Sequence, residues 1–205
     1  MVKILAASDI HGDVGTVYKL VEKAEKYDVD AIVLAGDLTL ADDFKGNIIG
    51  PFLKLGKEIM ILGGNHDSFA TIDFLSKMYN VKNLHGNYVI IGDTAFFGCG
   101  GANIGSFALD ENEIEEILKK AHSRVSKVKN KVMITHVHPS GSRAEKMTTL
   151  FPGSSGVANF ILKYSPNIHI CGHVHEAEGL EEKIGNTKVY NVGEKGKIID
   201  TSSFD

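Results

Sequence analysis

Histidine, acidic and amide side chains recur in five short polar stretches of this 205-residue sequence. The stretches read SDIHGD, GDL, GGNHD, THVHP and CGHVHE in chain order, and each follows an apolar run. The residues in them that could do chemistry are Asp9, His11, Asp37, Asn65, His66, Asp67, His136, His173 and His175. Oxygen and imidazole donors without a thiolate favour a divalent transition metal over a structural zinc site of the cysteine type. These residue types therefore indicate a site for a divalent metal.

The spacing of these residues suggests two ions. Asp9 and His11 are two positions apart, as are His173 and His175, and in extended chain such residues point to the same side. Each pair could hold one ion, and a single aspartate between the clusters could bridge both, because a carboxylate has two oxygens. Two ions ~3.5–4 Å apart are a known device for hydrolysing phosphate esters. We expect two divalent ions, with manganese favoured and iron, zinc, nickel or cobalt as alternatives.

Alternating strand and helix patterns must position these residues. Apolar runs at 2–7, 30–36 and 58–64 predict buried strands, and helices are predicted over 15–27 and 68–80. The first helix shows one apolar face, with Val17, Leu20, Val21 and Ala24 at helical spacing. Residues 43–56 give an ambiguous, partly helical pattern, because Pro51 and glycines interrupt it. This alternation predicts an α/β fold with a largely parallel sheet.

The second half of the chain has a different pattern. Gly92-Asp93 separates two apolar runs within 83–101 and predicts a hairpin. A helix is predicted over 110–128, a strand over 131–136, a long loop over 137–156, a helix over 156–164 and a strand over 168–173. Residues 180–193 and 195–204 are expected to close the chain as antiparallel strands. Ligands of parallel sheets bind beyond the strand carboxyl ends, so all five polar stretches should meet at one rim.

The ordered motifs DIH, GD, GNHD, TH and GHVH resemble those of the calcineurin-like metallophosphoesterase family. They run from Asp9 to His175 and so cover nearly the whole chain. The fourth motif is commonly Gly-His in the family and is Thr135-His136 here, which keeps the histidine. The resemblance implies a four-layer α/β/β/α sandwich of the metallo-dependent phosphatase type, with a dinuclear metal centre between loops.

The resemblance also implies roles for the candidate residues. One metal would be held by Asp9, His11 and His175, the other by Asn65, His136 and His173, and Asp37 would bridge them. His66 would be the histidine beside the scissile phosphate that does not bind metal. Apart from the resemblance, the place of Asp67 next to His66 suggests that its carboxylate could orient the His66 ring. The nucleophile would be a water or hydroxide bound to the metals.

The expected function is a metal-dependent phosphoester hydrolase acting on a small phosphoester. A phosphodiesterase is favoured over a phosphomonoesterase, because small members resembling this layout often act on diesters. A binding scaffold is an alternative, although His66 and the full ligand set count against it. A nuclease of the same family is a weaker alternative, because the chain ends about thirty residues after His175 and lacks the additional DNA-capping region.

Composition agrees with one domain over residues 1–205, with 43% hydrophobic and 23% charged residues. The formal net charge of -4 provides no global basic field, so a nucleic-acid partner is not favoured. A homo-oligomer is compatible with the sequence. The apolar run before Ser8 is too short for a signal peptide or a membrane span. Two cysteines, Cys99 and Cys171, make a disulfide framework unexpected and fit a cytoplasmic protein.

Several other polar residues have open or structural interpretations. His138 could belong to a substrate loop or be a solvated histidine, and Arg143 and Lys146 could contact phosphate or lie in a solvated loop. Of the remaining histidines, His85 is expected in a turn, His122 on the surface of a helix and His169 in a structural position. The glycine-rich segment 98–105 lacks the glycine spacing of a dinucleotide fingerprint and is expected to form a tight loop near the site.

Overall fold

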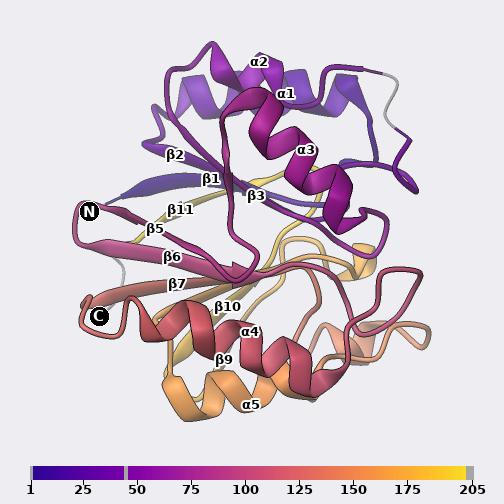
Figure 1. Ribbon diagram of the computed structural model, residues 1–205, viewed down its shortest axis with the longest axis vertical. Helices are drawn as coiled ribbons and strands as arrows, with labels where there is room; N and C mark the ends of the chain where they lie inside the picture. Colours follow the sequence, from indigo (N-terminus) through magenta and orange to yellow (C-terminus); the bar gives the residue numbers. More distant parts are fainter. Residues whose placement is uncertain (1, 44–45, 202–205) are drawn as a thin grey trace.

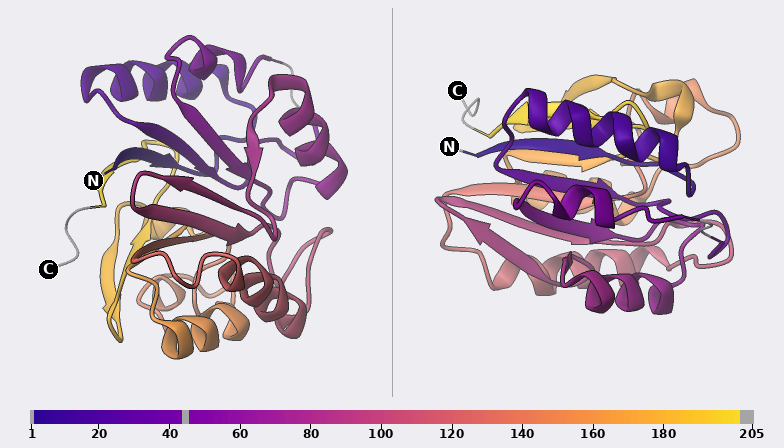
Figure 2. Two further views of the ribbon diagram at one scale, coloured as in Figure 1. Left: turned by 60° about the vertical axis from the view of Figure 1, so that its left-hand side comes forward. Right: turned by 90° about the horizontal axis from the view of Figure 1, so that it is seen from above.

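The computed structural model describes residues 2–43 and 46–201 and arranges them in four layers (Figure 1). Two β-sheets face each other in the middle of the molecule, and helices cover the outer face of each sheet (Figure 2). This is the α/β/β/α sandwich that the resemblance to the phosphoesterase family implies. Within the described residues, no helix is both long enough and apolar enough to cross a membrane.

The first sheet has the strand order β11-β1-β2-β3-β4. Its strands are β1 (Lys3–Ala7), β2 (Ala31–Ala35), β3 (Glu58–Leu62), β4 (Lys82–Asn83) and β11 (Lys197–Asp200). Strands β1 to β4 pair in parallel, whereas β11 pairs antiparallel with β1. The three predicted strands of the first half are confirmed. The short β4 is not foreseen, because two residues carry no readable periodicity.

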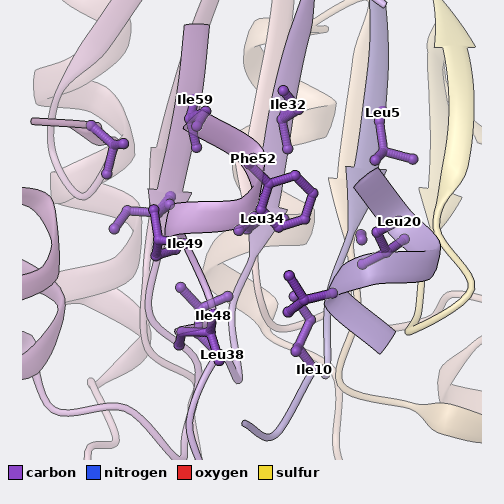
Figure 3. Packing of buried hydrophobic residues seen from close by; sticks show 14 of the residues in the cluster. Leu5, Ile10, Leu20, Ile32, Leu34, Leu38, Ile48, Ile49, Phe52 and Ile59 are labelled. Carbon is purple, nitrogen blue, oxygen red and sulfur yellow. The ribbon is translucent and has the colours of Figure 1, made fainter. Parts of the chain in front are cut away.

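Three helices pack on the outer face of this sheet: α1 (Val14–Lys26), α2 (Gly50–Leu53) and α3 (Phe69–Tyr79). Side chains of Asp13 and Ser68 cap α1 and α3 at their N-termini. Figure 3 shows Phe52 of α2 lying over Leu34 of the sheet, within one apolar cluster. The ambiguous segment 43–56 thus contains one short helix, and its residues 44–45 lie outside the described part.

The second sheet has the order β5-β6-β7-β8-β10-β9. Its strands are β5 (Tyr88–Ile91), β6 (Thr94–Cys99), β7 (Asn130–Thr135), β8 (Ile168–Cys171), β9 (Glu181–Ile184) and β10 (Thr187–Asn191). The predicted hairpin at Gly92-Asp93 is confirmed as β5–β6. At the chain end segment 180–193 forms the antiparallel pair β9–β10, and β10 also pairs in parallel with β8. Segment 195–204 contributes β11, which pairs antiparallel with β1 in the first sheet and not with segment 180–193. Residues 202–204 of the last predicted strand lie outside the described part.

Helices α4 (Glu111–Ser123) and α5 (Ser155–Tyr164) cover the outer face of the second sheet. Two 3-10 turns, η1 (Glu145–Met147) and η2 (His175–Ala177), lie in the loops after β7 and β8. A capping box of Asp110 and Glu113 begins α4. His122 of α4 is only partly exposed, because its ring packs against Phe160 and Tyr164; the expectation of a surface position is corrected.

The inner faces of the two sheets share a second apolar cluster. Ile4 and Ala6 of β1 face this cluster, whereas Leu5 and Ala7 face the outer helices. Strands buried on both faces must be apolar at every position, which explains the continuous apolar runs of the sequence. The loops that follow β1, β2, β3, β7 and β8 carry all five polar stretches.

Candidate metal centre

The candidate ligands come together from both sheets. Asp9 and His11 follow β1, Asp37 follows β2, and Asn65 follows β3 in the first sheet. The remaining three come from the loops of the second sheet: His136 after β7, and His173 and His175 after β8. Among the described residues, the side chains that could share a cation fall into three overlapping groups, all of them from these loops and that of His66. The expected convergence at one rim is therefore present.

The first group consists of Asp9, His11 and His175, whose potential ligand atoms all lie within 4.8 Å of one another. Oδ1 of Asp9 is buried, has no hydrogen-bond donor and lies 3.4 Å from Nε2 of His175. The other oxygen of Asp9 accepts hydrogen bonds from the hydroxyl of Ser8 and from the backbone N–H of His173, at 3.2 Å in the second case. The carboxylate is thus fixed through one oxygen while the other is available to a cation.

The second group consists of Asp37, His136 and His173, and Asn65 joins it. Nε2 of His136 lies 3.2 Å from Oδ2 of Asp37, 3.1 Å from Oδ1 of Asn65 and 3.3 Å from Nδ1 of His173. Ligands bound at ~2.0–2.2 Å around one ion are themselves separated by roughly this distance. The donor set and its spacing therefore fit a divalent transition metal.

Asp37 lies between the two groups. Its Oδ2 is 3.2 Å from Nε2 of His136 and 4.0 Å from Nε2 of His11. It also forms the third group, with His11 and His66. Its Oδ1 accepts the backbone N–H of His66 at 2.9 Å, which holds the carboxylate in this position. This placement between both groups is the geometry that a bridging ligand requires.

The charges of the buried groups balance one another. Burial alone would favour the neutral carboxyl of Asp37, but the facing His136 ring holds its pKa below the usual value. In the same way burial opposes a charged His136, and the carboxylate of Asp37 nevertheless raises the pKa of His136 to about 10. Burial and the neighbouring His136 lower the pKa of His173 to about 3. A divalent cation among these groups would balance the carboxylates directly and leave all the imidazoles neutral.

Four of the candidate ligands have left-handed backbone conformations. The φ angles are +57° for Asp9, +49° for His11, +50° for Asp37 and +72° for His173. For residues other than glycine such conformations cost about 1–3 kcal/mol each and persist where the surrounding structure enforces them, often at functional sites. Here the sharp turns bring side chains from loops of both sheets to the same point.

Glycines next to the ligands allow the loops to approach closely. A Cβ atom on Gly64 would collide with Oδ1 of Asp37 and lie 2.7 Å from the ring of His136. A Cβ atom on Gly172 would collide with the hydroxyl of Ser8 and lie 2.6 Å from Oδ2 of Asp9. At both positions glycine is needed because of close packing, since neither residue has a positive φ.

The backbone of His66 is held on both sides. Its N–H donates to Asp37, and its C=O accepts from the N–H of Asp42 at 3.1 Å and the hydroxyl of Thr39 at 3.3 Å. The ring is half-buried and lies edge-on to the ring of His11, with 5.1 Å between centroids. The backbone is therefore held, and the imidazole lies beside His11 of the first group and Asp37 of the second.

Asp67 has partners other than the ring of His66 that the sequence suggested. Its buried carboxylate accepts from the N–H of Leu38 at 3.0 Å, from the N–H and hydroxyl of Thr39 at 2.8 and 2.7 Å, and from the N–H of Gly64 at 3.0 Å. These bonds tie the loop after β2 to the loop after β3. The single hydroxyl hydrogen of Thr39 is shared between Asp67 at 2.7 Å and the C=O of His66 at 3.3 Å, so Asp67 holds Thr39 beside the backbone of His66.

We expect Asp67→Asn to lower the free energy of unfolding by about 2–4 kcal/mol. The NH₂ group of asparagine would replace one carboxylate oxygen and face the N–H donors that now bond it, so these buried groups would be left unpaired. Urea denaturation of the metal-free protein measures this loss. Asp13→Asn is a matched control, since asparagine caps helix α1 as well as aspartate does. Equal stability of Asp67→Asn and the control would contradict this role.

Other polar residues are now placed as well. His169 is structural as expected: it is fully buried and its Nε2 lies 2.8 Å from the hydroxyl of Thr135. Nδ1 of His85 accepts the backbone N–H of Gly100 at 3.1 Å. The sequence suggested only a turn at His85, so this hydrogen bond was not expected. His138 is fully buried, so the solvated interpretation is corrected. Arg143 is exposed and donates to the backbone C=O of Glu181 on β9 at 3.4 Å.

Two features of the site were missed by sequence reasoning. The hydroxyl of Ser8 bonds Asp9, which its place at the end of β1 could have suggested. Phe151 packs on the ring of His173 with 4.7 Å between centroids. It comes from the long loop after β7, and no local pattern distinguishes it from its neighbours there.

Two neighbouring cavities open at the centre and share Asn65 and His66. The central one, of about 180 Å³, is lined by His11, Asp37, Asn65, His66, Phe151, His173, His175 and Glu176. The outer one, of about 290 Å³, is lined by Ala41, Asn65, His66, Gly105, Ser106 and Phe107. The glycine-rich segment expected near the site thus does contribute to its wall.

The comparison with known families agrees with this site. Residues 2–177 match the calcineurin-like phosphoesterase family, and the chain belongs to it. The matched span contains every candidate ligand and His66. Family membership indicates a metal-dependent phosphoesterase, and the candidate groups show side chains suited to hold its metals. No curated protein sequence matches the chain significantly.

Solved structures share the fold at low sequence identity. TT1561 from Thermus thermophilus superposes with a TM-score of 0.79 and 18% identity, over 100% of this chain and 96% of that one. A dimetal phosphatase from Danio rerio superposes with a TM-score of 0.66 and 10% identity, over 94% of this chain and 88% of that one. GAP50 of Plasmodium is described as an anchor in the inner membrane complex. It superposes with a TM-score of 0.59 and 12% identity, over 95% of this chain and 72% of that one. Because the fold also occurs in an anchor protein, the function must be argued from the site.

Proposed function

We propose that this protein is a phosphodiesterase that hydrolyses small diesters at a centre of two divalent ions. The observation that supports this best is the position of Asp37 between two groups of ligands, within reach of His11 on one side and His136 on the other. Asp9, His11 and His175 would hold one ion, and Asn65, His136 and His173 the other. When bound, such ions stabilise charge on phosphoryl oxygens and lower the pKa of a water molecule toward neutrality.

His66 is the group that we assign to the substrate. Its backbone is held by hydrogen bonds, and its side chain lines both the central and the outer cavity. A phosphate in the central cavity would then direct its leaving group into the outer cavity, past the imidazole. A protonated His66 can donate to the leaving oxygen there, which is general acid catalysis.

The charges around the centre favour a diester over a monoester. No lysine or arginine is among the described residues that line the two cavities or the neighbouring acidic one, whose wall includes Glu178 and Glu194. Without a basic side chain among these residues, only the metals and His66 would offset the second negative charge of a monoester dianion, whereas a diester carries a single negative charge. Glu176 in the central cavity adds further repulsion toward a dianion.

The same charges count against a nucleic-acid substrate, because a polyanion next to Glu176 and Glu194 would be repelled. The complete ligand set and the fixed His66 count against a scaffold without activity. Nitrogen and oxygen ligands suit manganese, with iron, zinc, nickel or cobalt as alternatives. We also propose a reducing, cytoplasmic location, since Cys99 and Cys171 are buried and free, and burial raises the pKa of the Cys99 thiol to about 12.

Hydrolysis of paired substrates tests the proposal. We expect bis(p-nitrophenyl) phosphate to give a kcat/KM at least ~10-fold higher than p-nitrophenyl phosphate with the manganese-loaded protein. Cyclic nucleotides and single-stranded DNA extend the panel, and zinc, nickel, magnesium and iron replace manganese in parallel assays. A higher kcat/KM for the monoester would overturn the diester preference, and no hydrolysis with any metal would favour the scaffold.

A further inference from the structure

Three ring nitrogens without a hydrogen-bond partner lie together beside the metal centre. They are Nε2 of His173 and both ring nitrogens of His138. His138 is fully buried and His173 is 4% exposed. Their rings are stacked, with 6.2 Å between centroids and 26° between planes. Buried polar atoms in proteins nearly always have a partner, so such a group needs an explanation.

Metal binding decides which nitrogen of His173 carries the proton. Nδ1 lies 3.3 Å from Nε2 of His136 and therefore faces the second group of ligands. A neutral imidazole that offers the lone pair of Nδ1 to a cation carries its proton on Nε2. That N–H is on the other side of the ring and is buried, so it requires an acceptor.

The neighbours of His173 suggest the acceptor. Besides His136, the rings that pack on it are those of Phe151 at 4.7 Å and His138 at 6.2 Å. Of these two, His138 has a nitrogen lone pair and Phe151 has none. The centroids of the two histidine rings are too far apart for direct ring contact, which leaves space for one bridging water molecule between their nitrogens.

The loop around His138 keeps its ring in place. The backbone C=O of His138 accepts the N–H of Ser154 at 2.8 Å, and Glu145 accepts the N–H groups of Gly141 and Gly153 at 2.5 and 2.8 Å. These bonds close the long loop after β7 upon itself. A buried side chain on a backbone held in this way is suited to orient a neighbouring ligand.

We propose that His138 is a positioning residue for His173. It accepts the Nε2–H of His173 through one water molecule and so holds the ring with Nδ1 toward the second ion. This role rests on the proposed metal centre, but it concerns the affinity for the second ion and can be tested without substrate. Partners of this kind typically change metal affinity by ~10–100-fold.

Zinc titration against a chromophoric chelator tests the role. We expect His138→Phe to weaken binding of the second zinc ion by ~10–100-fold and to leave the first unchanged. His138→Asn keeps a carbonyl acceptor and should retain most of the affinity. His122→Phe is the matched control, because the same substitution in α4 lies among Phe97, Phe160 and Tyr164. Should His138→Phe not fold, His138→Leu replaces it as the variant without an acceptor.

A second readout follows the proton itself. In the zinc-loaded wild-type protein the Nε2–H of His173 should give an NMR signal that is protected from exchange, and in His138→Phe it should exchange faster or shift. Wild-type affinity for both zinc ions in His138→Phe would overturn the inference. A wild-type protein that binds fewer than two zinc ions would instead overturn the proposed metal centre.

Discussion

Asp37→Asn is expected to bind at most one ion per chain and to lose at least ~100-fold in phosphoesterase activity. The substitution removes the negative charge between the two groups of ligands and replaces one oxygen donor by an amide NH₂. Loss of a partner outside the ligand shell already lowers metal affinity by ~10–100-fold, and a bridging ligand should matter more. Elemental analysis after saturation with manganese and removal of the excess measures the ion content.

The backbone makes this experiment interpretable. Asp37 has a φ of +50°, a conformation that asparagine adopts as readily as aspartate, so the fold should be kept. Asp28→Asn provides a matched control, since Asp28 has a φ of +44° but its side chain is 88% exposed and pairs with Lys57. Two ions retained at full occupancy in Asp37→Asn would refute the bridging role.

His66→Asn should keep both ions and lose ~10²–10⁴-fold in activity, the usual range for general acid catalysis. The loss should depend on the leaving group. A nitrophenolate departs without a proton, whereas an alkoxide from a nucleoside or sugar needs one. We therefore expect a larger defect with alkyl diesters than with aryl diesters, measured as the ratio of kcat/KM between wild type and variant for each class.

The aryl and alkyl substrates act as controls for each other. An equal loss on both classes would indicate that His66 stabilises charge on the phosphate and donates no proton. Loss of an ion in His66→Asn would make the side chain a ligand, as its place in the group with His11 and Asp37 allows. Metal analysis and kinetics together therefore separate the three roles.

Local patterns in the sequence predicted much of the fold. Continuous apolar runs predicted β1, β2 and β3, because strands buried on both faces need apolar residues at every position. Helical spacing of Val17, Leu20 and Ala24 predicted the buried face of α1. Local patterns could not predict the pairing of β10 with β8 and of β11 with β1, since strand order depends on contacts between distant segments.

The sequence by itself determined which loops carry the candidate residues, because ligands of parallel strands lie beyond the carboxyl ends of the strands. That loops of two different sheets meet at one place was decided by the packing of the sheets. What those residues bond was decided by the tertiary structure. Asp67 follows His66 directly, yet its carboxylate binds Leu38, Thr39 and Gly64, since the loop after β2 presents its N–H groups there. His138 resembles a loop residue in sequence but is buried against His173. Burial and hydrogen-bond partners depend on how loops from different strands pack, and no local pattern contains that information.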